Sequence, residues 1–403
     1  MERNRLPRQI GLLYLIFYGV GNVVGAGIYI LLGKIAQISG YYTPIAFLLA
    51  SLAILLTALC YAELSARYPH SAAEAIYLQE GLALPLIPQL SALFIIVGAL
   101  LSSAALVSGV YGYLRPLIDI GAVGSSLATL TLLVLIALWG IKESLFFNAI
   151  FTFMEILGLG LILWYGLPQI DFAHLDLGRY IPKADPKEVE MVLMGSFLAI
   201  YAYIGFEDIT KLSEEAKDPR RSIPLAIFWT LAIVTILYVG VAFVAVTLIP
   251  PQQLAQSDEV LATLYQRIAH QDYLLNIIAL FSILNGTLVQ LIMVSRLIYA
   301  GAKEGWFPSF LAKLHPMTKT PWSATLIGAA LIFLLTLWLD LLTLAQLTSY
   351  GILILFSGVD LSLLLIKRKK PAPPSIYQVP SWVPIAAVAL NISLMVLALF
   401  WHF

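Results

Sequence analysis

Apolar residues along this chain fall into long runs that short polar segments separate. A helix needs about 20 apolar residues to cross the hydrocarbon core of a bilayer. Most of the runs reach that length, so the pattern predicts a bundle of eleven membrane-spanning helices. The expected spans are residues 10–38, 43–66, 83–114, 124–141, 145–168, 191–212, 222–249, 272–300, 322–339, 341–366 and 382–402.

The first apolar run is unusual because Gly19, Gly21, Gly25 and Gly27 lie together near its middle. Each glycine costs a helix about 1 kcal/mol relative to alanine, so we expect the helix to be interrupted there. Interrupted backbone at membrane depth is tolerated where it is buried in protein or lines a wet cavity. The alternative is that these glycines only allow helices to pack closely.

A broken span would expose peptide groups of both polarities. The N–H groups that begin its second half, at Gly25, Ala26 and Gly27, would favour a carboxylate. The carbonyls that end its first half, near Gly19 and Gly21, would favour a cation. Together these groups supply the two poles that a zwitterion needs.

The sixth apolar run repeats this feature, because residues 201–208 (YAYIGFED) place a glycine and two carboxylates inside it. Glycine-interrupted spans in corresponding positions of two halves are typical of inverted-repeat transporters with a site at the membrane midplane. The spacing pairs spans one to five with spans six to ten. We therefore expect a first repeat over residues 1–168, a second over 191–366 and an additional span over 382–402.

Composition and charge agree with a membrane protein. Hydrophobic residues make up 60% of the chain and charged residues 11%, which excludes an ordinary soluble domain. Most lysines and arginines outside the spans fall on the side of the N-terminus. The positive-inside rule then predicts a multi-pass protein of the cytoplasmic (inner) membrane, with the N-terminus inside and the C-terminus outside. The zero formal net charge argues against a nucleic-acid partner.

Five short motifs in this order carry a family resemblance. They are residues 21–29 (GNVVGAGIY), 61–69 (YAELSARYP), 202–208 (AYIGFED), 213–224 (SEEAKDPRRSIP) and 295–300 (SRLIYA). Over nearly its whole length the chain resembles the amino acid–polyamine–organocation (APC) transporter superfamily. The resemblance implies an all-α polytopic membrane protein, built as a five-plus-five inverted repeat with broken spans 1 and 6. It also implies secondary active transport of amino acids or amines.

The resemblance further implies where a substrate would bind. Amides of the span-one break would hold an α-carboxylate, and carbonyls beside the span-six break would hold an α-amine. Tyr201 would be an inner gate. Ser282 and Asn285 share one face of the eighth span and could line the cavity or contact a neighbouring helix. The expected substrate-binding residues are Gly21, Asn22, Val23, Gly25, Ala26, Gly27, Tyr201, Ala202, Tyr203, Ile204, Gly205, Ser282 and Asn285.

Glu155 is the charged residue of an otherwise apolar fifth span. A charge at the bilayer centre costs at least about 2.5 kcal/mol, and burial favours the protonated form of a carboxyl group. We therefore predict that Glu155 carries a coupling proton, with a sodium ligand or a hydrogen-bonded structural carboxyl as the alternatives. Several proton-coupled members of the superfamily carry a lysine at the aligned position, so their lysine mechanism does not transfer to this chain.

Other charged residues receive weaker interpretations. Glu207 is a candidate for gating or protonation, with helix capping as the alternative, and Asp208 is expected to be structural. Asp360 is expected to pair with the basic residues 367–370. The charged loop around residues 214–221 is expected either to close one side of the protein through Arg67 or Arg296 or to be simply solvated.

These observations predict a secondary transporter that takes up a small or neutral amino acid by alternating access, coupled to protons. Exchange of amino acids or polyamines and sodium-coupled symport are the alternatives. The histidines are scattered without metal-ligand spacing, and no nucleotide-binding motif is present. We therefore expect no enzyme activity, metal site or cofactor apart from the coupling ion. The expected partners are the amino acid and the lipid bilayer, and the oligomeric state stays open.

Overall fold

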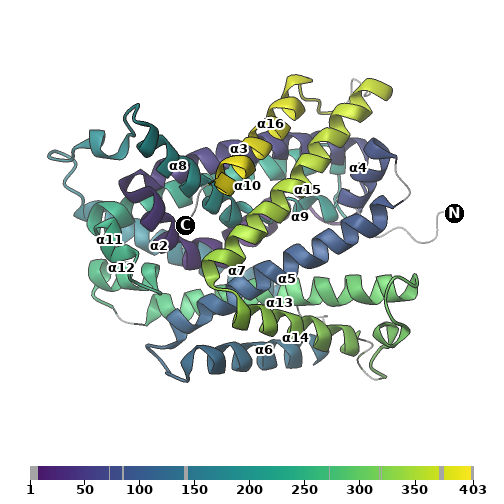
Figure 1. The fold of residues 1–403 in the computed structure, drawn as a ribbon, viewed down its shortest axis with the longest axis horizontal. Coiled ribbons are helices and arrows are strands. Elements are labelled where there is room, and N and C mark those ends of the chain that lie inside the picture. The colour runs from purple at the N-terminus through teal and green to yellow at the C-terminus, as the bar shows by residue number, and fades with distance from the viewer. Residues whose placement is uncertain are drawn as a thin grey trace.

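The computed structural model describes residues 8–71, 73–83, 86–139, 144–271, 273–316, 318, 320–371 and 376–400, and these ranges are almost entirely helical (Figure 1). The strand-like pairing within them is one isolated bridge between Ile10 and Ala216. The α-helices are α1 Leu12–Val24, α2 Ala26–Ser39, α3 Thr43–Arg67, α4 Ala73–Leu82, α5 Ile87–Leu114, α6 Gly121–Trp139, α7 Ser144–Gly166, α8 Pro186–Ala199, α9 Asp208–Lys211, α10 Pro219–Leu248, α11 Pro251–Leu254, α12 Val260–Ala269, α13 Leu274–Lys303, α14 Trp322–Trp338, α15 Leu341–Lys369 and α16 Trp382–Phe400. The 3₁₀ helices are η1 Gly40–Tyr42, η2 Leu167–Gln169, η3 Leu177–Tyr180, η4 Ile200–Tyr203 and η5 Ser309–Ala312.

The predicted spans are confirmed as helices. Within the described ranges, nine helical regions are long and apolar enough to cross a membrane, and α1 and α14 are shorter apolar helices. The protein is therefore an all-α, polytopic membrane protein. The short helices α4, α11 and α12 were not predicted. In α12 the buried side chains lie on one face, as in an amphipathic helix, and ten residues of helix reach only about 15 Å.

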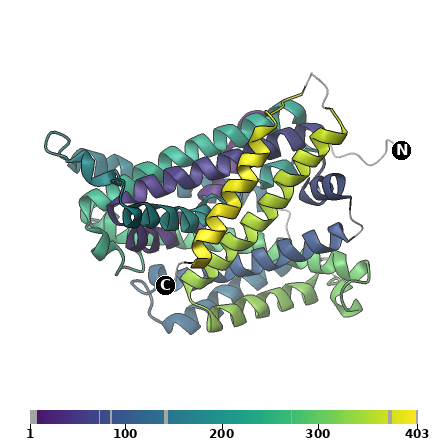
Figure 2. The ribbon, with the colours of Figure 1, turned by 45° about the horizontal axis from the view of Figure 1, so that its top comes forward.

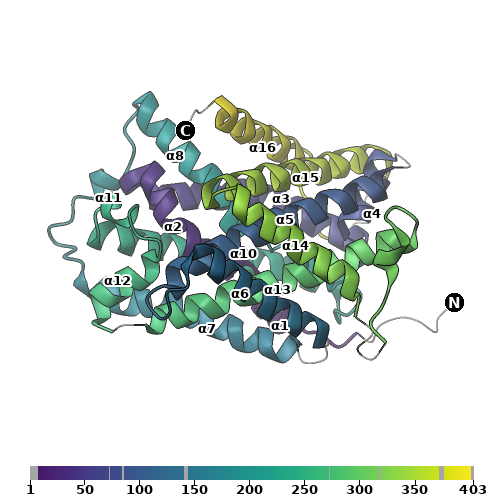
Figure 3. The ribbon, with the colours of Figure 1, turned by 60° about the horizontal axis from the view of Figure 1, so that its bottom comes forward.

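Two groups of helices make up the bundle. In the first group α10 packs against α1 and α3, and α8 packs against α2 and α3. In the second group α5, α6, α13 and α14 pack against one another, and Figure 3 shows them together. Helix α15 lies against α4 and α5 and runs beside the terminal α16 (Figure 2). The site described below lies where these groups meet.

The outer surface carries many exposed apolar side chains. Examples are Leu13, Trp139, Trp164, Ile236 and Trp338, each more than two-thirds exposed. A soluble monomer rarely exposes so much continuous apolar surface. This exterior therefore suits the hydrocarbon region of a bilayer.

The first predicted break is present, and it is narrow. Helix α1 ends at Val24, α2 begins at Ala26, and Gly25 between them has φ −7° and ψ −163°. A Cβ atom added at Gly25 would meet only the carbonyl oxygen of Asn22, at 3.4 Å, whereas one at Gly27 would lie 2.8 Å from Cα of Ala202. Interruption and close packing therefore both occur in this run, at different glycines.

The second predicted break is longer. Helix α8 ends at Ala199, η4 continues to Tyr203, and an irregular turn leads into α9 at Asp208. Within the turn Gly205 has φ +120°, a region that side-chain-bearing residues rarely adopt. A Cβ atom at Gly205 would also lie 2.7 Å from the carbonyl oxygen of Asn22. Glycine is thus required at the point where the two breaks touch.

Candidate functional site

A cavity with about 830 Å³ of empty space, including its open mouth, lies between the two helix groups. Its walls come from the two broken spans, from α5, α13 and α15, and from Glu74 on α4. Apolar side chains such as Phe94, Val289 and Leu355 cover much of the lining, and Gly98 and Gly351 leave room within it.

Asn22 connects the two breaks at the edge of this cavity. Its Nδ2 atom donates to the carbonyl oxygen of Gly205 at 3.3 Å and to Oδ2 of Asp208 at 2.5 Å. Of the residues predicted to act at the site, Asn22, Ile204, Gly205 and Glu207 line the cavity. The structure thus brings together one residue of the first break and three of the second.

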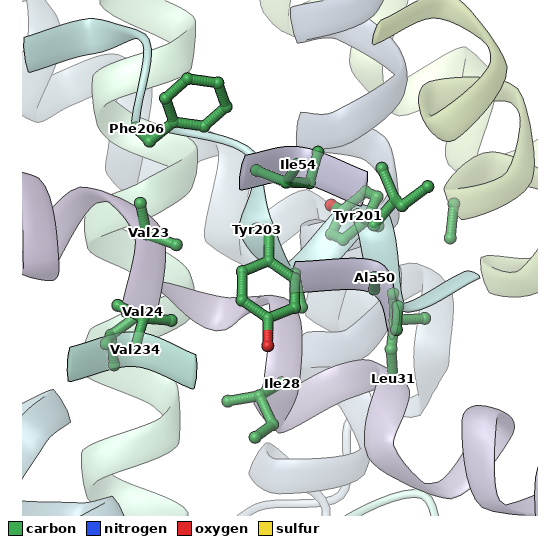
Figure 4. Close-up of a cluster of buried hydrophobic side chains, with 14 of the residues drawn as sticks. Val23, Val24, Ile28, Leu31, Ala50, Ile54, Tyr201, Tyr203, Phe206 and Val234 are labelled. Carbon is green, nitrogen blue, oxygen red and sulfur yellow. The ribbon is translucent and has the colours of Figure 1, made fainter. Parts of the chain in front are cut away.

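Other predicted residues lie behind the cavity wall. Figure 4 shows Val23 of the first broken span and Tyr203 of the second in a cluster of buried hydrophobic side chains. The hydroxyl of Tyr238 lies 2.8 Å from the carbonyl oxygen of Val23 and 3.0 Å from that of Ala202. The carbonyl of Ala202, beside the span-six break where an α-amine was expected to bind, is thus already hydrogen-bonded. Gly21, Gly25 and Gly27 are likewise not part of the cavity lining, and the side chain of Ala26 lies outside the described part of the structure.

Tyr201 is not part of the cavity lining, but it hydrogen-bonds to Ser102, which is. Its hydroxyl donates to the carbonyl oxygen of Ser102 at 3.0 Å and lies 3.1 Å from the Ser102 hydroxyl. Gln290 donates from Nε2 to that hydroxyl at 3.0 Å and accepts from Ser103 at 2.9 Å. Ser102 and Gln290 both line the cavity. These hydrogen bonds join η4, α5 and α13 in one layer at this end of the cavity, and the gate role of Tyr201 stays a prediction.

The two carboxyl groups after the second break have different hydrogen-bond partners. Glu207 is 7% exposed, and its Oε2 atom accepts from the backbone N–H of Gly205 at 2.9 Å. Asp208 accepts from Asn22 and forms an ion pair with Lys211, one turn later on α9. Sequence reasoning favoured only Glu207 for the site, yet Asp208 and Lys211 also line the cavity. Their spacing of three residues on a helix was the available signal.

Glu74 adds a third carboxyl group to the cavity from outside the spans. It lies in the first turn of α4 and is 4% exposed. Desolvation on burial raises its pKa above the usual value, and the nearby charge of Lys211 opposes that shift. Nothing in the local sequence around Glu74 indicated that a loop helix would reach the site.

Glu155 occupies a separate, fully buried place on α7. Ser282 and Asn285 of α13 are the polar side chains near its carboxyl group. Among the described residues, neither carboxyl oxygen of Glu155 nor the hydroxyl of Ser282 has a hydrogen-bond partner. Tyr29 of α2 donates to the backbone oxygen of Glu155 at 2.9 Å. Ser282 and Asn285 are therefore neighbours of Glu155 and not part of the cavity wall, which α13 supplies from Gly286 onward.

Asp360 does not pair with the basic residues 367–370 at the end of α15, so that expectation is wrong. Its Oδ2 atom accepts from the Thr57 hydroxyl at 2.8 Å and from Asn391 at 3.2 Å. The basic segment has another partner, because Lys367 donates to the buried Glu63 at 2.7 Å. Asp360 thus connects α3, α15 and α16 inside the bundle.

Among the described residues, the charged loop between α9 and α10 forms no ion pair with Arg67, which pairs with Glu63, or with Arg296. Instead, Glu214 accepts from the backbone N–H of Ser71 at 3.2 Å. The backbone oxygen of Glu215 accepts from Ile10 at 3.0 Å. The loop therefore holds the start of α1 and the entry to α4 at the end of the bundle where α15 finishes. We call this end, with Arg67, Lys367 and Lys370, the basic end.

The sequence is similar to those of known transport proteins. A family model described as an amino acid permease matches residues 10–402. The chain is 28% identical to the methylthioribose transporter of Bacillus subtilis (strain 168), over 95% of this chain and 86% of that protein. It is 28% identical to the branched-chain amino acid permease BcaP of the same organism, over 98% and 89%. It is 29% identical to the mitochondrial cationic amino acid transporter 3 of Arabidopsis thaliana, over 94% and 65%.

The match covers nearly the whole chain, including both broken spans and every helix that lines the cavity. The chain therefore belongs to the amino acid permease family of the APC superfamily.

Proposed function

We propose that this permease takes up a neutral amino acid by alternating access and couples uptake to protons. The observation that carries the proposal is the cavity at which both broken spans meet. Asn22, Gly205 and Asp208 place an amide, a carbonyl and a carboxylate at its edge. An amino acid needs such groups for its charged ends, and the apolar walls suit an uncharged side chain.

The coupling role belongs to Glu155 in this proposal. A buried carboxyl group without a hydrogen-bond partner is held most cheaply as the neutral acid. In each transport cycle the Glu155 carboxyl group would bind a proton when the bundle is open to one side and release it when the bundle is open to the other. Sodium is the alternative coupling ion, because the carboxyl oxygens of Glu155 and the hydroxyl oxygen of Ser282 are hard ligands that lie close together.

We also propose an orientation and a repeat. The cavity extends from the Tyr201 layer toward Glu74 and Lys211, near the basic end. Under the positive-inside rule the basic end faces the cytoplasm, so the cavity would be open inward. The Tyr201 layer would then lie at its outer end, which differs from the inner-gate role that the family resemblance implies for Tyr201. Residues 1–168 and 191–366 would form the two inverted repeats, each with its first span broken.

Uptake into proteoliposomes tests the function. We expect purified protein to accumulate a labelled neutral amino acid when an inward proton gradient is imposed, and not when only a sodium gradient is imposed. Leucine, alanine, lysine, glutamate and methylthioribose should be offered separately. If none of the amino acids is taken up under any gradient, the proposed function is wrong.

Glu155→Gln tests the coupling role. We expect the variant to bind and exchange the amino acid but to lose accumulation on a proton gradient, because an amide cannot carry the proton. Glu190→Gln, at an exposed position of α8, is the matched control and should behave as wild type. Accumulation by Glu155→Gln on a proton gradient would contradict the role. Accumulation that follows sodium in the wild type would favour symport with sodium.

A further inference from the structure

Among the described residues that line the cavity, Lys211 is the cationic one, and three others carry carboxyl groups. It ends the four-residue helix α9, and the i,i+3 spacing puts it on the same face as Asp208. Its Nζ atom pairs with Oδ1 of Asp208 and lies 3.9 Å from Sδ of Met293. The side chains of Lys211 and Asp208 are 31% and 22% exposed. The pair is therefore reachable from the cavity.

The three carboxyl groups of the cavity differ in their hydrogen-bond partners and in their burial. Glu207 accepts from the peptide N–H of Gly205 within its own turn. Glu74 is buried, at 4% exposed. Asp208 has Asn22 on one oxygen and Lys211 on the other. Asp208 is only partly buried, whereas Glu74 and Glu207 are buried, so Asp208 is the acidic group most accessible to a ligand, and Lys211 pairs with it.

We propose that Lys211 is a tethered counter-cation that makes this cavity select neutral amino acids against cationic ones. The inference rests on the proposed transport function and extends it to the basis of specificity. A cationic side chain in the cavity would have to compete with Lys211 for Asp208. A neutral side chain leaves the Asp208–Lys211 pair intact and meets the apolar wall.

An acidic substrate is the other ligand that a lysine could attract. The carboxyl groups of Glu74 and Glu207 also line the cavity, and Lys211 offers no unpaired charge. Asp208 already holds Lys211 at hydrogen-bond distance. A carboxylate side chain entering the cavity would therefore face more repulsion than attraction.

The test compares wild type, Lys211→Met, Lys211→Arg and the control Lys369→Met, an exposed lysine at the basic end. Leucine, lysine and glutamate compete against labelled leucine in proteoliposomes. We expect lysine to compete poorly against labelled leucine for the wild-type protein and for the Lys211→Arg and Lys369→Met variants. In Lys211→Met the uncompensated Asp208 should raise the apparent affinity for lysine at least about tenfold relative to leucine, and Asp208→Asn added to it should abolish that gain.

Two results would overturn the proposal while leaving the transport function standing. One is a wild type that accepts lysine or glutamate as well as leucine. The other is a Lys211→Met variant that still binds leucine with unchanged selectivity. Competition binding to the purified variants in detergent gives the same readout where a variant does not transport, and Lys211→Gln serves where the methionine variant does not fold. By contrast, a wild type that takes up no amino acid refutes the proposed function itself.

Discussion

A buried charge network at the basic end yields the sharpest stability prediction. Glu63 of α3 is fully buried, and Arg67 and Lys367 beside it are 7% and 13% exposed. One carboxylate oxygen accepts from Arg67 at 2.6 Å, and the other accepts from Lys367 and from the backbone N–H of Val379, both at 2.7 Å. The network joins α3 to α15 and to the segment that leads into α16. The perturbation is Glu63→Gln.

The expected cost follows from what this change leaves behind. Glutamine keeps the size of the side chain but removes its charge, so two buried cations lose their counter-ion. Removing one partner of a buried ion pair typically costs about 3–5 kcal/mol. The amide N–H₂ group of the glutamine would also face Arg67 or Lys367, which are hydrogen-bond donors and cannot accept from it. We therefore expect Glu63→Gln to lower the melting temperature by several degrees.

Glu80→Gln is the matched control, because Glu80 pairs with Lys370 at 2.7 Å at the same end of the bundle. That pair is 36% and 63% exposed, so water and salt screen it. We expect its loss to leave the melting temperature unchanged within error. Purified variants in detergent would be heated at several scan rates and followed by circular dichroism, since unfolding of such proteins is often irreversible.

Equal melting temperatures for wild type and both variants would refute the reasoning. That result would mean that the buried network contributes no more than an exposed pair. A large loss for Glu80→Gln and none for Glu63→Gln would refute it more strongly, because burial would then have the opposite effect.

Three further predictions concern the site. Gly205→Ala should cost about 1–3 kcal/mol and abolish uptake, because φ is +120° and the new methyl group would meet Asn22; Gly160→Ala, where a Cβ atom meets nothing within 4 Å, should do neither. Gly351→Leu should fold, since its Cβ atom also meets open space, and should reduce uptake of leucine more than of alanine; equal reductions would argue against a side chain bound there. Glu74→Gln should melt at or above wild type at pH 8 and equal to it near pH 4. The raised pKa of Glu74 means that folding becomes less favourable as pH rises through it, and a variant less stable only at pH 8 would show the opposite sign.

The sequence was most informative where one segment is enough to determine the structure. Helices cross a bilayer because the length of an apolar run and internal hydrogen bonding suffice, and the predicted spans are helical. The break at Gly25 was predictable because clustered glycines weaken a helix locally. The resemblance to the APC superfamily was also carried by short local motifs, and the family is confirmed.

The cavity could not be predicted in the same way. Ser102, Gln290, Lys211 and Glu74 come from four separate elements, and only packing brings them to one cavity. Ser282 and Asn285 were expected at the cavity because they share a helix face, yet that face meets Glu155. A helical pattern defines which residues point the same way, but not which neighbour they meet.

The sequence by itself therefore determined the class of the protein, the positions of its spans and the two places where they break. These properties depend on residues close together along the chain and on the thickness of a bilayer. Only the tertiary structure decided which polar groups at the breaks are already hydrogen-bonded, as Tyr238 binds Val23, and which remain in reach of a ligand, as Asp208 does. The physical reason is that satisfying a buried polar group requires a partner from another helix, and helix packing determines that partner.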